Sequence, residues 1–139
     1  MGTEIFSHLN WLAVLVAAAG YFILGAIWYS FLFKNAWIRL SGVNVNDPNG
    51  KKGLGGIMFT SFILMFIASL GIAIILNKLV VVDLMSGIKT GLVAGVCFSA
   101  TGLSISYLYE KKSLGLHLIN GIYNIAGCVI AGIILAMWR

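Results

Sequence analysis

Charged residues are scarce in this chain, and acidic residues are the scarcest. Only 9% of the 139 residues are charged, and the four acids are outnumbered by nine lysines and arginines. A soluble globular domain carries about a quarter charged residues, so the composition excludes that class. With 60% of its residues hydrophobic, the chain has the composition of an integral membrane protein.

Acids are also missing from every long apolar run, which removes most catalytic chemistry. Glu4, Asp47, Asp83 and Glu110 all lie outside those runs, so no carboxylate pair can act as general acid and base at membrane depth. The sequence has no HExxH metal-binding spacing, no GxSxG nucleophile motif and no phosphate-binding loop. We therefore expect a protein that is not an enzyme and that has no cofactor and no metal site.

Cysteine and proline are rare as well. Cys97 and Cys128 both fall within apolar runs, so neither a disulfide framework nor a structural zinc site is expected. Whether the two thiols are in contact is left open by the sequence. The one proline, Pro48, lies in a stretch rich in asparagine and glycine, which is typical of a turn.

Four long apolar runs make up most of the chain, at residues 10–33, 54–77, 84–109 and 114–138. Each reaches the ~20 residues that cross ~30 Å of hydrocarbon. Their one formal charge, Lys89, lies near enough to an end to reach the interface. Because short connections make neighbouring helices antiparallel, we predict an all-α, up-down four-transmembrane-helix bundle. It forms a single membrane domain over residues 1–139, and the first run is a retained helix, not a cleaved signal peptide.

The distribution of basic residues predicts the orientation. The loop at residues 34–53 and the turn between the last two runs carry six cations, Lys34, Arg39, Lys51, Lys52, Lys111 and Lys112. The opposite side carries three, Lys78, Lys89 and Arg139. The positive-inside rule then places the basic loops in the cytoplasm and both termini outside, in the bacterial inner membrane, although the margin leaves dual topology open. We expect Lys34, Arg39, Lys51 and Lys52 to bind anionic lipid headgroups, and we expect no nucleic-acid partner.

Small residues recur every four positions on the third run. Gly87, Gly91, Gly95 and Ser99 form a ridge that permits close helix contact, either with another helix of the same chain or with a second copy of the protein. The second run, rich in large apolar residues, is predicted to be the most lipid-exposed helix.

Polar residues at membrane depth are costly and therefore informative. On the fourth run, His117, Asn120 and Asn124 share one stripe of a helix. We predict a cytoplasmic-side cluster contributed by the first, third and fourth runs: Tyr21, Trp28, Tyr29, Thr101, Ser104, His117, Asn120 and Asn124. The cluster has two interpretations, hydrogen bonds that specify packing, or a small cavity for a polar solute with His117 as its titratable member.

Two known classes of similar size are instructive comparisons. Small multidrug exporters depend on a glutamate in the first helix, and this chain has no acid there. Fluoride-channel-like dimers use asparagine, phenylalanine and hydroxyl groups, but the similarity is limited to size and composition.

A more specific resemblance is carried by three segments near the start of the chain and one near its end. Residues 10–16 (NWLAVLV), 24–30 (LGAIWYS) and 33–37 (FKNAW), with 118–123 (LINGIY), Gly132 and Trp138, resemble the small bacterial four-span proteins grouped as domain of unknown function 1761. The resemblance extends over essentially the whole chain, and Gly25, Trp28, Tyr29, Ser30 and Trp37 are its most specific part. It implies a membrane fold and no established activity.

Two functional hypotheses follow from the sequence. The first is a non-enzymatic membrane protein that self-associates, or serves as a small subunit of a larger complex, through the ridge of Gly87, Gly91 and Gly95. The second is a permeation or binding protein for a small solute or ion that uses the polar cluster.

Overall fold

The computed structural model describes residues 9–41, 53–79 and 83–138, and this part of the chain contains helices and no strand. Several residues used above lie outside the described residues: Glu4, Asp47, Pro48, Lys51, Lys52 and Arg139. Nothing further is inferred for them from the structure.

Four helical spans are long and apolar enough to cross a membrane, at Trp11–Leu32, Gly55–Asn77, Leu84–Tyr109 and Leu114–Met137. The first consists of α1 (Trp11–Ile27) and a π-helical turn, η2 (Trp28–Leu32), and the second is α3 (Leu54–Asn77). The third span joins α4 (Leu84–Leu92), the π-helical η3 (Val93–Ala100) and α5 (Thr101–Tyr109), and the fourth is α6 (Leu114–Met137). A short helix, α2 (Lys34–Ser41), follows the first span. These bounds confirm the predicted all-α fold with four apolar spans.

The helix starts are set by local side-chain chemistry. Asn10, Asp83 and Ser113 are N-caps whose side chains accept hydrogen bonds from the backbone N–H three residues later, as N-cap residues do. At the start of α4 the Asp83 carboxylate accepts from both the backbone N–H and the hydroxyl of Ser86, each at 2.8 Å. These hydrogen bonds hold the pKa of the Asp83 carboxyl below its usual range.

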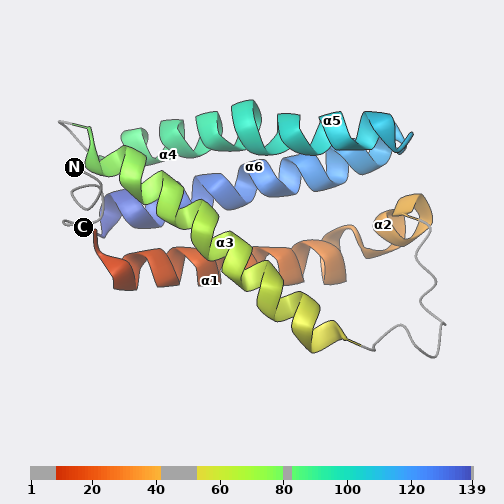
Figure 1. Cartoon of the computed structure of the whole chain (residues 1–139), viewed down its shortest axis with the longest axis horizontal. Coiled ribbons are helices and arrows are strands. Elements are labelled where there is room, and N and C mark those ends of the chain that lie inside the picture. The colour runs from red at the N-terminus through yellow and green to blue at the C-terminus, as the bar shows by residue number, and fades with distance from the viewer. Residues whose placement is uncertain (1–8, 42–52, 80–82, 139) are drawn as a thin grey trace.

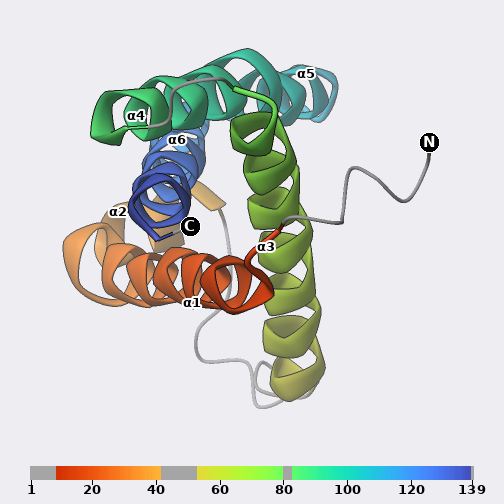
Figure 2. The same ribbon diagram turned by 90° about the vertical axis from the view of Figure 1, so that its left-hand side faces the viewer.

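The spans alternate in direction, and α6 is central (Figure 1). It lies between α1 on one side and the third span on the other, while α3 crosses all three obliquely (Figures 1 and 2). The start of α1 and the end of α6 meet at one end of the bundle, where Asn10 and Trp138 line the same pocket. The α5–α6 turn and α2 lie at the other end (Figure 1).

The third span packs against α6 through its glycines, with almost no space between the two backbones. A Cβ added to Gly91 would lie 2.6 Å from the Cys128 carbonyl oxygen, and one added to Gly95 would lie 2.6 Å from the Cα of Ile125. Gly87 lies against Gly132, and a Cβ added to either glycine would collide with the carbonyl oxygen of the other. Gly87, Gly91 and Gly95 therefore pack within the chain, which is the first of the two alternatives given above, and the hypothesis that they contact a second copy is wrong.

The packing of α1 and α3 in the core also uses small residues. Ala13, Ala17 and Ala18 of α1 are fully buried, as is Ser69 of α3, whose hydroxyl has no hydrogen-bond partner in the structure. In lipid, helices associate through such close packing because there is no hydrophobic drive between them.

Residues 54–77, predicted to form the most lipid-exposed helix, are not the least buried of the four spans within the chain. Only 11% of the third span's most apolar stretch is buried in the protein, compared with 22% for the second span and 50% for the fourth. The physical reason is that the third span contacts the rest of the fold mainly along its narrow glycine ridge, whereas α3 crosses the bundle and contacts α1, α6 and α4.

We predict that Gly91→Ala destabilises the fold by about 1–3 kcal/mol because the added methyl group must separate two packed backbones. Gly71 is the matched control, since it also lies within a membrane span and a Cβ there meets no atom within 4 Å. Thermal unfolding in mild detergent should show a lower Tm for Gly91→Ala and an unchanged or higher Tm for Gly71→Ala. Equal Tm values for the two variants would contradict the packing described here.

Candidate functional site: a tyrosine and asparagine network

Among the described residues, Asn120 on α6 and Ser69 on α3 are the buried polar residues that are not aromatic. The Asn120 Oδ1 accepts a short hydrogen bond from the hydroxyl of Tyr29 on η2. Its Nδ2 donates to the Tyr107 hydroxyl on α5 at 2.7 Å. One amide thus joins three of the four spans, and both its oxygen and its nitrogen have partners.

One turn further along α6, Asn124 continues the network toward the middle of the bundle. Its Oδ1 accepts from the Tyr21 hydroxyl at 2.5 Å, and its Nδ2 donates to the backbone carbonyl of Asn120 at 2.8 Å. The two asparagines are therefore linked to each other as well as to α1 and η2. The structure places Tyr21, Tyr29, Asn120 and Asn124 together, as predicted.

Tyr123 lies among the rings of this network. Its ring is 5.5 Å from that of Tyr21 and 5.2 Å from that of Tyr29, both in edge-to-face geometry. Its hydroxyl donates to the Tyr21 carbonyl at 3.3 Å. A Cβ on Gly25 would lie 2.7 Å from the Tyr123 hydroxyl oxygen, so Gly25 provides the space for this tyrosine.

Trp28 and His117 lie at the edges of the network. The Trp28 indole N–H donates to the Ile119 carbonyl at 3.1 Å, which ties the end of the first span to α6. The His117 Nδ1 and the Ser104 hydroxyl are 3.1 Å apart, and the imidazole packs edge-on against the Tyr107 ring at 5.3 Å. Trp28 thus contacts α6, and His117 contacts the third span. Neither residue bonds directly to an asparagine side chain.

Thr101 does not join the cluster, and its predicted place there is wrong. It is exposed, and its hydroxyl donates to the carbonyl of Cys97 on its own helix at 2.7 Å. The cause is the π-helical segment η3, in which the backbone repeat lengthens from four residues to five. Beyond Gly95, Ala100 lies next to α6, 3.8 Å from the position of a Gly121 Cβ. Thr101 is consequently turned outward.

Three residues of the site were not predicted. Tyr107 has the sequence position of an interfacial tyrosine, near the end of a span. Tyr123 could have been predicted, since it is three residues after Asn120 on the same stripe of the helix. Ser99 was assigned to the glycine ridge, but it lines a groove beside the network instead.

This groove, here called the Ser99 groove, is a hollow of about 300 Å³ where α3 diverges from the third span. It is lined by Tyr21, Ser61, Leu64, Met65, Ala68, Ser99, Tyr123 and Asn124. A second hollow of about 340 Å³ continues toward α1 and shares Ser61, Met65 and Tyr123 with it. The groove is lined by residues of α1, α3, the third span and α6, and α3 runs obliquely to the other spans (Figure 1).

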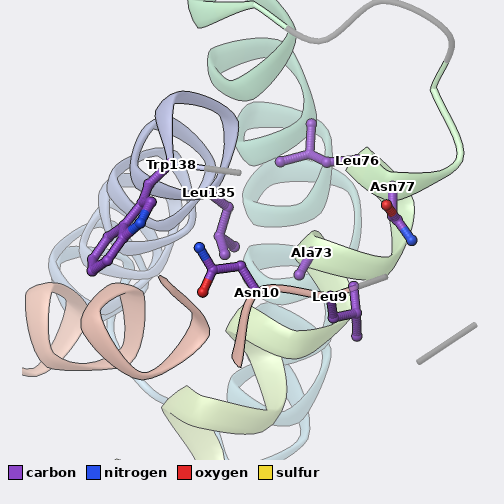
Figure 3. A pocket seen from close by; sticks show the side chains of 7 residues that line it. All are labelled: Leu9, Asn10, Ala73, Leu76, Asn77, Leu135 and Trp138. Carbon is purple, nitrogen blue, oxygen red and sulfur yellow. The ribbon is translucent and has the colours of Figure 1, made fainter. Parts of the chain in front are cut away.

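A separate pocket of about 260 Å³ lies at the opposite end of the bundle from α2. Figure 3 shows its lining, Leu9, Asn10, Ala73, Leu76, Asn77, Leu135 and Trp138, with the Asn10 amide directed toward Leu135 and Trp138. None of these residues belongs to the tyrosine and asparagine network, so the two sites are independent.

The cations predicted to contact lipid headgroups are exposed where the structure describes them. Lys34 and Arg39 lie on α2, which is held against the bundle by Leu40 over Gly115 and by an edge-to-face contact between Trp37 and Tyr29.

The chemistry available to the network is hydrogen bonding. Its members are amides, phenols, an indole and one imidazole, with no carboxylate. Within residues 9–41, 53–79 and 83–138, no group of three or more His, Cys, Asp or Glu side chains is placed to hold a metal ion. Cys97 is exposed and Cys128 is buried, and both are free thiols.

The fold and this site define a multi-pass membrane protein with four apolar spans, three of which are joined by a polar network. Residues 12–136 match the family model DUF1761, a protein family of unknown function, and the chain belongs to that family. The match confirms the resemblance drawn from the sequence. Comparison with curated proteins and with solved structures gives no match.

A double-mutant cycle should measure the central bond of the network. We predict that Tyr29→Phe and Asn120→Ala each lower the free energy of unfolding, and that their effects couple by about 0.6–1.7 kcal/mol, the range for hydrogen bonds between transmembrane helices. Tyr109→Phe is the matched control, because this tyrosine is 87% exposed and the change likewise removes one hydroxyl. If the cycle of Tyr109→Phe with Asn120→Ala shows coupling of equal size, the hydrogen bond of Tyr29 is not the cause of the coupling.

Proposed function

We propose that this protein is a non-enzymatic membrane protein that self-associates in the plane of the bilayer, with the outward face of the third span as the contact surface. The observation that carries this proposal is the low burial of that span, 11% of its most apolar stretch. A span held to its own chain mainly by a glycine ridge has most of its surface available to another helix.

The composition of the outward face supports the same proposal. Between its large apolar residues it exposes small or weakly polar ones at four-residue spacing, Cys97 with Thr101 and Gly102 with Ser106. Such pairs let helices approach closely in lipid, where packing and hydrogen bonds drive association. In a dimer with a two-fold axis normal to the membrane, the two third spans are parallel and Cys97 lies near its own copy.

The tyrosine and asparagine network is better suited to holding the bundle together than to conducting a solute. The oxygen and the nitrogen of the Asn120 and Asn124 amides all bond within the protein, and the Tyr123 ring packs edge-to-face against the rings of Tyr21 and Tyr29. A pathway for a polar solute needs groups that can exchange partners with it. We propose packing specificity as the role of these residues.

The proposed location is a bacterial inner membrane, with the α2 end of the bundle in the cytoplasm and both termini outside. Support comes from Lys34, Arg39, Lys111 and Lys112, all exposed, because α2 and the α5–α6 turn lie at the same end of the molecule (Figure 1). Four of the six basic residues that the structure describes then lie on the cytoplasmic side, in agreement with the positive-inside rule.

Oxidative cross-linking in native membranes tests the contact surface. With Cys128→Ser, which keeps the exposed Cys97, we expect a disulfide-linked dimer on a non-reducing gel, and with Cys97→Ser we expect none. A cysteine at Ile67 in a background without the two native cysteines is the control for random collision, since Ile67 is 56% exposed on α3. A dimer at Ile67 but not at Cys97 would place the contact on α3, and no dimer at either position would contradict self-association through the third span.

Cysteine labelling in intact cells tests the orientation. Leu79 and Leu114 are exposed at opposite ends of the bundle and carry no charge, so Leu79→Cys and Leu114→Cys leave the charge balance unchanged. In a background without the native cysteines, we expect a membrane-impermeant maleimide to label Leu79→Cys in intact cells and Leu114→Cys only after lysis. The reverse pattern would place the termini inside, and equal labelling of both would show dual topology.

A further inference from the structure

The bend between the first span and α2 forms a hollow of about 670 Å³ on the surface of the bundle. Its lining changes from apolar to basic along its length: Ser30, Phe31, Leu32, Lys34, Asn35, Ala36 and Arg39. The two kinds of lining come from two helices, since η2 supplies the first three residues and α2 supplies the rest.

The apolar part of the hollow lies at the end of a membrane span. Phe31 is 81% exposed and Leu32 is 60% exposed, so both project from the protein at the level where the span leaves the hydrocarbon. Trp28 fixes this turn from behind, through its bond to the Ile119 carbonyl and its ring contact with Phe33 at 4.6 Å. A lipid chain can pack against these two exposed side chains without disturbing the bundle.

The basic part of the hollow carries two cations, and none of the lining residues is acidic. The described parts of the chain contain two acids, and neither belongs to residues 9–41, which include the first span and α2. Asp83 is the N-cap of α4 at the other end of the bundle, and Glu110 lies in the α5–α6 turn beside two lysines of its own. Cations therefore outnumber acids at this end, which favours an anion at Lys34 and Arg39.

Arg39 and Asn35 are four residues apart and so share one face of α2. These side chains match the chemistry of a phosphate diester. An arginine can donate two parallel hydrogen bonds to phosphate oxygens, a lysine contributes a compact charge, and an asparagine amide donates one more bond. Because Leu40 packs over Gly115 and Trp37 packs against Tyr29, α2 is already held in place before any ligand arrives. Little ordering is then required on binding.

We infer that this hollow binds one anionic glycerophospholipid, with its phosphate at Lys34, Asn35 and Arg39 and an acyl chain against Phe31 and Leu32. The inference rests on the membrane placement proposed above, but not on self-association or on the direction of insertion. It narrows the predicted headgroup contacts to one defined site on the described part of the chain.

Native mass spectrometry after reconstitution tests it. Protein in vesicles of phosphatidylcholine and phosphatidylglycerol is released with mild detergent, and the phosphatidylglycerol retained per chain is measured. We expect the double variant Lys34→Gln/Arg39→Gln to retain about 25-fold less than the natural chain, since each of the two cations contributes on the order of a fivefold gain near an anionic surface. Phe31→Ser should also lower retention, whereas excess inorganic phosphate should not displace the lipid.

The charge-matched control is Lys111→Gln/Lys112→Gln, which removes two exposed cations from the same end of the bundle but none from the hollow. Its retention should equal that of the natural chain. Equal losses in both double variants would overturn the site in favour of a diffuse electrostatic effect, and displacement by inorganic phosphate would assign the hollow to a soluble anion. Because the readout is lipid per chain, a failure of the Cys97 cross-link leaves this result unaffected.

Discussion

Backbone contact between the third span and α6 is the constraint on which the rest of the structure depends. Lipid gives helices no hydrophobic reason to associate, so the contact must come from atoms packed at close range. Gly87 and Gly91 allow this by placing the third-span backbone against Gly132 and Cys128 of α6. Such a contact is narrow, and for that reason the third span is both firmly positioned and widely exposed.

The polar network adds register to that contact. Asn120 bonds to Tyr29 on one side and to Tyr107 on the other, so a slide of either neighbouring span along α6 would leave a hydroxyl or an amide without a partner in hydrocarbon. Packing by glycine tolerates small displacements, whereas these bonds do not. The two devices together fix the distance and the axial position of the spans around α6.

Much of the fold follows from hydropathy, because only a helix satisfies its own backbone groups in lipid. The predicted limits at residues 84–109 coincide with the third span, and those of the other runs differ from the structure by at most a residue at each end. The stripe of His117, Asn120 and Asn124 was also predictable, since α6 is a regular helix.

Two features of the structure could not be predicted from the sequence. The π-helical step in η3 moved Thr101 outward and brought Tyr107 to Asn120, and no residue of Val93–Ala100 signals that step. The oblique path of α3, which opens the Ser99 groove, depends on the summed packing of the whole bundle.

The central position of α6 has a consequence for the order of events during synthesis. Translation delivers the N-terminal helices first, and α6 is the last of the four in chain order. Until it enters the bilayer, Tyr21, Tyr29 and Tyr107 lack their asparagine partners and the glycines of the third span lack the surface they pack against. The first three spans therefore wait in the membrane as an incomplete intermediate whose tyrosines and glycine ridge lack the partners that α6 supplies.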